Sequence, residues 1–260
     1  MNYGLYLSAS GLLVNRHMQD VVSNNIANVN TVGFKPDMPI IRQREPERLE
    51  DNLSLDDPNR LLENLGGGSL LNPTVTLFRD GALRQTGNPL DLAVRGEGFF
   101  TLSSGATANS TRLRFTRDGA MSIDNNGMLV HSGSGMRVLD ENDRPIEVDP
   151  TRGDVRIESD GSVKQGNTTV ARIQLITIAD LQAFEKEGAN TFRLGNTEQN
   201  SRLPASGSIS QGWLETSAVD PMQSLMELNR TTAAVSANAQ MIRYQDELMN
   251  SAINRLGRFV

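Results

Sequence analysis

The stretch DPMQSLMELNRTTAAVSANAQMIRYQDELMNSAINRL, residues 220–256, decides the fold class. Asp220 is placed to cap a helix, Pro221 fits the first helical position, and Gln223 completes a capping box. One apolar row repeats every seven residues, and a companion row runs three residues earlier. The rows are Leu228, Val235, Ile242, Met249 and Leu256, and Leu225, Thr232, Ala239, Asp246 and Ile253. The pattern predicts one long helix that pairs with another helix, although it also fits a helix packed on the core of its own domain.

The N-terminal stretch predicts a second amphipathic helix. Its apolar residues recur at spacings of three and four, which is the period of one helix face. They are Leu5, Ala9, Leu12, Leu13, Met18, Val21, Val22, Ile26 and Val29. Gly33 supplies a turn after the helix end, so we expect a helix over residues 3–29. The two helices would then pair as a coiled-coil-like core built from both ends of the chain.

The residues between these helices carry β-hairpin signals. Four Asp-Gly or Asn-Gly turns separate short alternating or β-branched runs such as LDLAV, MSI, VRI and VARIQLITI. The fold class is therefore α+β, with a central, mostly antiparallel β-rich domain. We expect residues 1–35 and 215–260 to form the helical core, and residues 75–214 the β domain. Residues 36–74 read as an extended connector, charged over 42–64, with one short helix near 59–65.

Composition excludes several classes of function. The 260 residues carry a net charge of −6, with a pI near 5.1, which gives no basic field for nucleic acid or an anionic membrane. The absence of cysteine removes disulfides, thiolate catalysis and the usual zinc sites. The sequence shows neither a cleavable signal peptide nor an apolar run of about 20 residues that would span a membrane.

Catalytic signals are equally sparse. The two histidines, His17 and His131, have no recognisable partner in the sequence, so a structural role is the better interpretation of each. Gly96-Glu97-Gly98 precedes a strand-like Phe-Phe-Thr-Leu run instead of a helix, so it reads as a turn and not as a phosphate loop. No metal motif of the zinc or calcium type is present. We therefore expect no catalytic, cofactor-binding or metal-binding residue.

Four blocks in the chain resemble the flagellar rod, hook and hook-associated axial proteins. They are SNNIANVNTVGFK at 23–35, TGNPLDLAVRGEGFF at 86–100, FTRDG at 115–119 and QGWLETSAVDP at 211–221. The blocks follow the family's order and span nearly the whole chain. The length of this chain and its four blocks are most similar to those of the rod proteins, of either the proximal or the distal rod.

The resemblance implies a structural subunit without enzyme activity. It implies export by the flagellar type III apparatus without a cleaved signal, location in the extracytoplasmic basal body, and assembly with itself and with other rod and hook proteins. Surrounding ring proteins are further candidate partners. The hook protein or another axial component is the alternative. A cell-wall-cleaving enzyme is a remote one, because it would need two carboxylates at glycosidase separation.

The terminal helices are the expected assembly interface. Fixing their roughly 70 residues opposes folding by about 1–2 kcal/mol each in backbone entropy, which a two-helix pair alone hardly offsets. Neighbouring subunits would supply the remaining contacts and, because such contacts do not close, form an open filament. Asn25 fits either a bond between subunits or a helix-terminating role. The expected interface residues are Leu5, Leu12, Val22, Asn25, Ile26, Leu228, Val235, Ile242, Met249, Ile253 and Leu256.

Overall fold

The computed structural model describes residues 3–44, 67–105, 113–149, 153–195 and 202–256. Unit 1 comprises Met1–Ala27, Asp37–Thr76 and Asp220–Val260, and unit 2 comprises Asn28–Pro36 and Leu77–Val219. Helices from the two chain ends flank central antiparallel sheets, which confirms the α+β class. The predicted short helix near 59–65 lies outside the described residues. The predicted domain boundaries stay a prediction.

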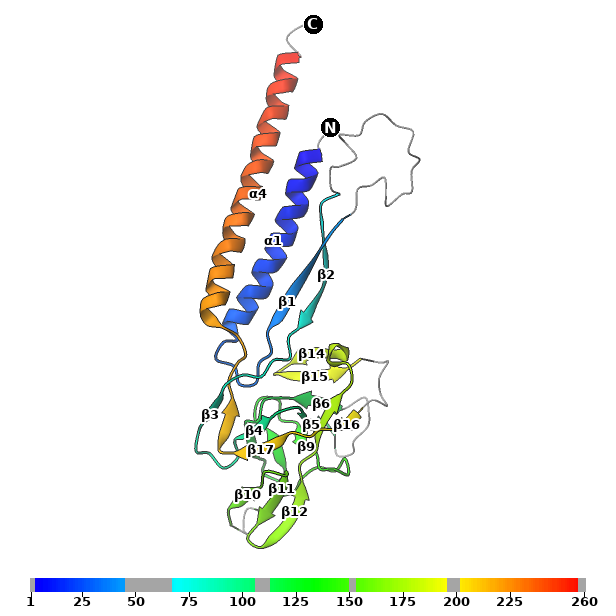
Figure 1. Cartoon of the computed structure of the whole chain (residues 1–260), viewed down its shortest axis with the longest axis vertical. Helices are drawn as coiled ribbons and strands as arrows, with labels where there is room; N and C mark the ends of the chain where they lie inside the picture. The colour runs from blue at the N-terminus through cyan, green and yellow to red at the C-terminus, as the bar shows by residue number, and fades with distance from the viewer. Residues whose placement is uncertain (1–2, 45–66, 106–112, 150–152, 196–201, 257–260) are drawn as a thin grey trace. The chain divides into compact units, whose positions relative to one another are not determined.

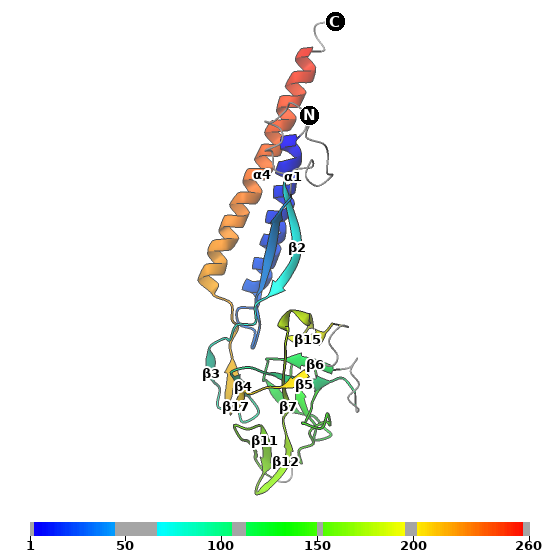
Figure 2. The same cartoon turned by 45° about the vertical axis from the view of Figure 1, so that its right-hand side comes forward.

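Two antiparallel helices form the body of unit 1, α1 (Tyr3–Ala27) and α4 (Pro221–Leu256). They lie side by side in both views (Figures 1 and 2). The N-cap of α4 is the predicted one, because Asp220 Oδ1 accepts hydrogen bonds from the backbone N–H of Met222 at 2.9 Å and of Gln223 at 3.1 Å. The helix N-terminus therefore begins where local chemistry places it.

A two-stranded hairpin completes the described part of unit 1. Strands β1 (Asp37–Gln43) and β2 (Ser69–Thr76) pair antiparallel, with a register shift between Met38 and Ile40, and run beside α1 (Figure 1). The sequence did not predict either strand. Each contains a proline, Pro39 or Pro73, and proline within a run argues against a strand because it removes a ladder donor.

Unit 2 is built from short antiparallel strands. The largest of its described sheets has the order β14-β15-β6-β5-β9-β8-β7, with β13 joining β5 and β16 joining β13. Smaller sheets pair β10-β11-β12, β17 with β4, and β18 with β3. The strands are β3 (Leu83–Gln85), β4 (Leu92–Arg95), β5 (Phe99–Ser103), β6 (Leu113–Thr116), β7 (Met121–Ile123), β8 (Leu129–His131), β9 (Arg137–Val138), β10 (Val155–Ile157), β11 (Ser162–Gln165), β12 (Thr168–Arg172), β13 (Leu175–Ile178), β14 (Phe184–Gly188), β15 (Thr191–Leu194), β16 (Arg202–Pro204), β17 (Ser208–Gln211) and β18 (Trp213–Glu215), with a short 3-10 helix, η2 (Leu181–Ala183).

Two apolar clusters form the core of unit 2. One is mainly aliphatic and includes Leu92, Leu102 and Leu129, which are fully buried. The other is aromatic, with the rings of Phe78, Phe99, Phe115, Phe184 and Phe192 in edge or tilted contacts at centroid distances of 4.9–6.0 Å. Such pairs add about 0.5–1.5 kcal/mol each beyond area burial. Five of the eight phenylalanines of the chain thus pack together in one cluster.

Candidate assembly interface

The predicted interface residues occupy different environments. Leu228, Val235, Ile242 and Met249 form a half-buried row along α4, and on α1 Leu5, Leu12 and Ile26 are half-buried and Val22 is buried. Ile253 is exposed, and the side chain of Leu256 lies outside the described residues. One heptad row of α4 is therefore the half-buried one, whereas Leu225 and Ile253 of the companion row are exposed.

Two glycines of α1 allow the helices to approach closely. A Cβ built on Gly4 would lie 2.5 Å from Gln245 Nε2, and one built on Gly11 would lie 3.0 Å from Asn238 Nδ2. Gly4 and Gly11 are seven residues apart on α1, and Asn238 and Gln245 are seven residues apart on α4. The contact therefore repeats along the antiparallel seam between the helices. The interface residues predicted from the sequence do not include these glycines. The available signal was two glycines at heptad spacing inside a predicted helix.

A second apolar surface of α4 is exposed. We call it the outer apolar stripe; its residues recur at spacings of three, four or seven, which keeps them on one side of the helix. They are Met222, Met226, Ala233, Ala237, Met241, Tyr244 and Leu248. The five large side chains are between 51% and 69% exposed. Within the described residues of unit 1, the stripe is apolar surface left open to water.

Asn25 has both ends of its side-chain amide occupied within unit 1. Its Nδ2 donates to the carbonyl of Asp37 at 2.7 Å, and its Oδ1 accepts from the N–H of Asp37 at 3.0 Å. Asp37 Oδ1 in turn accepts from Thr76 Oγ1 at 2.8 Å. The buried amide of Asn25 thus pairs with the first residue of β1 as a strand backbone would, and it joins the base of the hairpin to the end of α1.

Replacing Asn25 by alanine is expected to loosen the hairpin. The change leaves the N–H and the carbonyl of Asp37 without these bonds, and unsatisfied buried polar groups destabilise by about 1–3 kcal/mol. Hydrogen exchange of the Asp37 amide should accelerate accordingly. Ser23→Ala, at an exposed position of the same helix end, is the matched control and should leave that rate unchanged. Equal exchange rates in both variants would contradict the role given to Asn25.

The residues that follow α1 form a compact turn in unit 2. Thr31 Oγ1 donates to Asn28 Oδ1 at 3.1 Å, a local side-chain bond of the kind that asparagine makes in turns. Gly33 has a φ of +64°, and a Cβ there would lie 2.7 Å from the backbone of Arg117. Phe34 is buried, with Lys186 Nζ 4.4 Å from its ring centroid. The left-handed backbone at Gly33 and the buried ring of Phe34 therefore hold this segment in place.

A group of four charges lies beside this turn, and three of them are buried; we call Lys35, Asp80, Arg117 and Glu215 the charge cluster. The side chains of Lys35 and Glu215 are each 1% exposed, and Lys35 Nζ lies 2.7 Å from Glu215 Oε1. Arg117 Nε lies 3.3 Å from Glu215 Oε2, and Arg117 Nη2 lies 2.6 Å from Asp80 Oδ1. The pKa of Lys35 lies below its ordinary value, because burial of the amine outweighs the opposing effect of the nearby Glu215 carboxylate.

Backbone groups supply further hydrogen bonds to the cluster. Arg117 donates to the carbonyls of Gly98 at 2.7 Å and Gly96 at 2.6 Å, so the Gly-Glu-Gly turn binds a guanidinium. Lys35 Nζ donates to the carbonyl of Arg79 at 2.7 Å. Buried charges persist when they are paired and hydrogen-bonded in this way. The residues therefore suit a structural role, because their polar atoms already bind one another.

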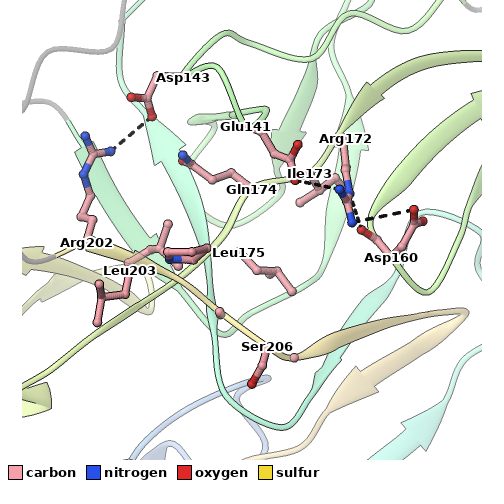
Figure 3. Close-up of a pocket in the computed structure, with 14 residues that line it drawn as sticks. Glu141, Asp143, Asp160, Arg172, Ile173, Gln174, Leu175, Arg202, Leu203 and Ser206 are labelled. Atoms are coloured by element: carbon pink, nitrogen blue, oxygen red, sulfur yellow. Dashed lines mark hydrogen bonds and ion pairs between the residues drawn. The ribbon is translucent and has the colours of Figure 1, made fainter.

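The polar hollow of unit 2 gives no catalytic arrangement. Its volume is about 720 Å³, and its charged side chains bind one another (Figure 3). Arg172 pairs with Glu141 at 3.2 Å and with Asp160 at 3.9 Å. Hydrogen bonds from the backbone and side chain of Ser162 lower the pKa of Asp160. A glycosidase acid needs a raised pKa, so this carboxylate is unsuited to that role.

The two histidines lie in different settings. His131 is fully buried, with Nδ1 2.8 Å from Ser134 Oγ and Nε2 3.2 Å from Asp118 Oδ2, a structural setting. His17 lies half-buried on α1. Among the described residues, no cluster of three or more His, Cys, Asp or Glu side chains is arranged for a metal ion. Neither α1 nor α4, as described, is long and apolar enough to cross a membrane.

Three family descriptions match separate parts of the chain. "Flagella basal body rod protein" matches residues 5–35, "Flagellar hook protein FlgE/F/G D1 domain" matches residues 93–165, and "Flagellar basal body rod FlgEFG protein C-terminal" matches residues 210–256. The first and third of these cover α1 with its following turn and α4 with its preceding strand. The second covers much of the β-rich unit.

Relatives that match this chain over nearly its whole length include rod proteins. The chain is 35% identical to the flagellar basal-body rod protein FlgF of Caulobacter vibrioides, over 99% of both chains. It is 30% identical to FlgG of Bacillus subtilis, over 96% of this chain and 97% of that protein. The flagellar hook protein FlgE of Treponema pallidum is 36% identical, but over 53% of this chain and 29% of the hook protein. The likeness to rod proteins is thus end to end, whereas the likeness to this hook protein is partial.

Proposed function

We propose a mode of assembly for this chain. The premise is that the chain belongs to the flagellar basal-body rod family of FlgF and FlgG proteins and is a structural, non-enzymatic subunit. We infer that the outer apolar stripe of α4 is the surface through which one subunit binds the terminal helices of its neighbours. The half-buried seam would hold α1 to α4 within the subunit. The expected interface residues would thus divide between an internal seam and contacts to other copies.

The exposure of the outer apolar stripe carries this proposal. The stripe has seven residues on one side of α4, and its five methionine, tyrosine and leucine side chains are exposed to water. Burial of such surface stabilises by about 25 cal/mol per Å², so the stripe favours contact with another apolar helix face. α1 contributes further exposed apolar groups, Tyr6 and Leu13. A second copy offers the same chemistry, and a repeated contact between unlike surfaces builds an open helical tube.

Partners and route follow as proposals from the family. Rod family proteins assemble with other flagellar axial proteins, and we expect neighbouring rod and hook subunits to bind the same helical surfaces. We expect export through the flagellar type III apparatus without a cleaved signal, and surrounding ring proteins to face unit 2. Residues 1–35 and 215–260 would then act as the axial core of the assembly.

Tyr244→Asp tests the proposal because it changes assembly and leaves the monomer intact. Tyr244 is 63% exposed, so the stability of the isolated chain should change by no more than about 0.5 kcal/mol. In the rod, the new carboxylate would be buried without a partner, which destabilises by several kcal/mol. We expect the variant to be missing from isolated basal bodies, as measured by immunoblot, and cells that carry it to be non-motile.

Asn250→Asp is the matched control. It adds the same charge at an exposed position about 120° around α4 from Tyr244, away from the outer apolar stripe. It should enter basal bodies at the wild-type level. Normal incorporation of Tyr244→Asp would overturn the interface assigned to the stripe, without affecting the family assignment.

A further inference from the structure

The C-terminal end of α4 projects past the described end of α1. Gly4 of α1 lies opposite Gln245, since a Cβ built on Gly4 would lie 2.5 Å from Gln245 Nε2. The described part of α1 begins at Tyr3, whereas α4 continues to Leu256 (Figure 1). At the rise of an α-helix, residues 246–256 extend about 16 Å farther. We call residues 246–256 the overhang.

The side of α4 that faces α1 continues along the overhang. Asp246, Met249 and Ile253 recur at spacings of three and four, and Met249 continues the heptad row of Ile242. Ile253 is 67% exposed, and every side chain from Asn250 to Asn254 is exposed. A short helical segment without a packed face is only marginally stable in water. The overhang thus extends the seam into a region where it is open to another copy of the chain.

The β1-β2 hairpin presents a second open surface of unit 1. Its sheet has two described strands, and an isolated hairpin of this size is marginally stable in water. Arg42 lies opposite Leu70 in the register, so their side chains share one face of the hairpin. Leu70 is 46% exposed, and Arg42 is exposed beside it. Pro39 and Pro73 disfavour addition of a further strand, so the side chains of this face are the surface available for a contact.

The overhang and the hairpin are complementary in charge. Asp246 is an exposed acid on the seam side of the overhang, and Arg42 is an exposed base on the hairpin. Neither side chain forms an ion pair within the described part of the chain. Each charge also lies near an exposed apolar side chain, Ile253 for the acid and Leu70 for the base. Opposite charges on two apolar surfaces favour one register of docking.

We propose that the overhang of one subunit docks on the β1-β2 hairpin of a neighbouring copy, with Asp246 beside Arg42 and Ile253 beside Leu70. The contact joins two unlike surfaces, so it propagates from copy to copy and does not close. It uses the side of α4 opposite the outer apolar stripe, so a subunit can make both contacts at once. The inference rests on the proposed function, because it names a second contact of the same assembly.

Charge reversal in the full-length chain tests the docking in cells. Arg42→Asp and Asp246→Arg each place like charges together, so incorporation into isolated basal bodies, measured by immunoblot, should fall on the order of tenfold or more. The double variant restores opposite charges and should recover most of the wild-type level. Arg42→Asp with Glu247→Arg is the matched control. Glu247 lies about 100° around α4 from Asp246, so this combination should stay low.

Cross-linking tests the contact itself. The chain has no cysteine, so Leu70→Cys with Ile253→Cys introduces one thiol on each surface. A short bis-maleimide should join neighbouring copies in isolated basal bodies, and denaturing gels should show dimers and longer species. Each cysteine variant alone is the control and should give far fewer dimers, because the contact brings unlike residues together.

Three results would each overturn the proposal. They are normal incorporation of both single charge reversals, no recovery in the double reversal, and no cross-linked species from basal bodies that contain the double cysteine variant. The cross-link is measured on chains that have already entered the basal body. Its absence is therefore distinct from a failure of the proposed function, which Tyr244→Asp tests separately.

Discussion

Deletion of residues 221–260 is expected to abolish incorporation of the chain into the basal body. The deletion removes α4, and with it the outer apolar stripe and one side of the seam with α1. The face of α1 that contacts α4 would be left without its helical partner, so its apolar side chains would be exposed to water. Cells that make only this truncated chain should be non-motile, and electron micrographs should show incomplete basal bodies.

A parallel deletion of residues 1–30 removes the other helix of the pair and should have the same effect. In contrast, unit 2 has its own apolar clusters and keeps Phe34 and Lys35 in both truncated chains, so each chain should retain the unfolding transition of unit 2, followed by Trp213 fluorescence. Complete, rotating flagella in cells that lack either terminus would show that the middle of the chain carries the function. That result would contradict assembly through the terminal helices.

Replacement of Glu215 by alanine should strongly destabilise unit 2. Lys35 and Arg117, whose side chains are 1% and 4% exposed, would lose the carboxylate between them. Removal of one partner from a buried ion pair costs about 3–5 kcal/mol, because the remaining charge stays desolvated. The change should appear in the free energy of unfolding, measured by urea titration with Trp213 fluorescence as the probe.

Asp80→Ala is the control for that measurement. Asp80 belongs to the same cluster, but its side chain is 61% exposed, and exposed pairs contribute about 0–1 kcal/mol. Both variants lose one carboxylate, so the difference between their free energies of unfolding gives the effect of burial. A loss below about 1 kcal/mol for Glu215→Ala would mean that Lys35 and Arg117 find other partners or water.

The elements that were predictable depend on local chemistry. The cap at Asp220, the proline after it and the heptad row through Ile242 lie on one continuous segment, and α4 formed as expected. The short strands of unit 2 were visible for the same reason, since alternation and Asx-Gly turns are local patterns. Hairpin β1-β2 was missed because Pro39 and Pro73 oppose a strand in sequence, while the pairing itself is tertiary.

The charge cluster was not predictable from spacing. Lys35 and Glu215 are 180 positions apart, and neither stands in a motif with chemical meaning of its own. Both lie inside blocks that resemble the axial family, but resemblance alone gave no partner for either. The outer apolar stripe had a local signal in Met241, Tyr244 and Leu248, at spacings of three and four. It was overlooked because the heptad rows already accounted for the helix.

Assembly through the terminal helices is tested most directly by a cryo-electron microscopy reconstruction of the rod that contains this chain. We predict that α1 and α4 lie in the wall of the helical tube, and that Met241, Tyr244 and Leu248 are buried against a helix of a neighbouring subunit. A reconstruction in which these three side chains face water, or in which α4 lies outside the tube wall, would contradict the account.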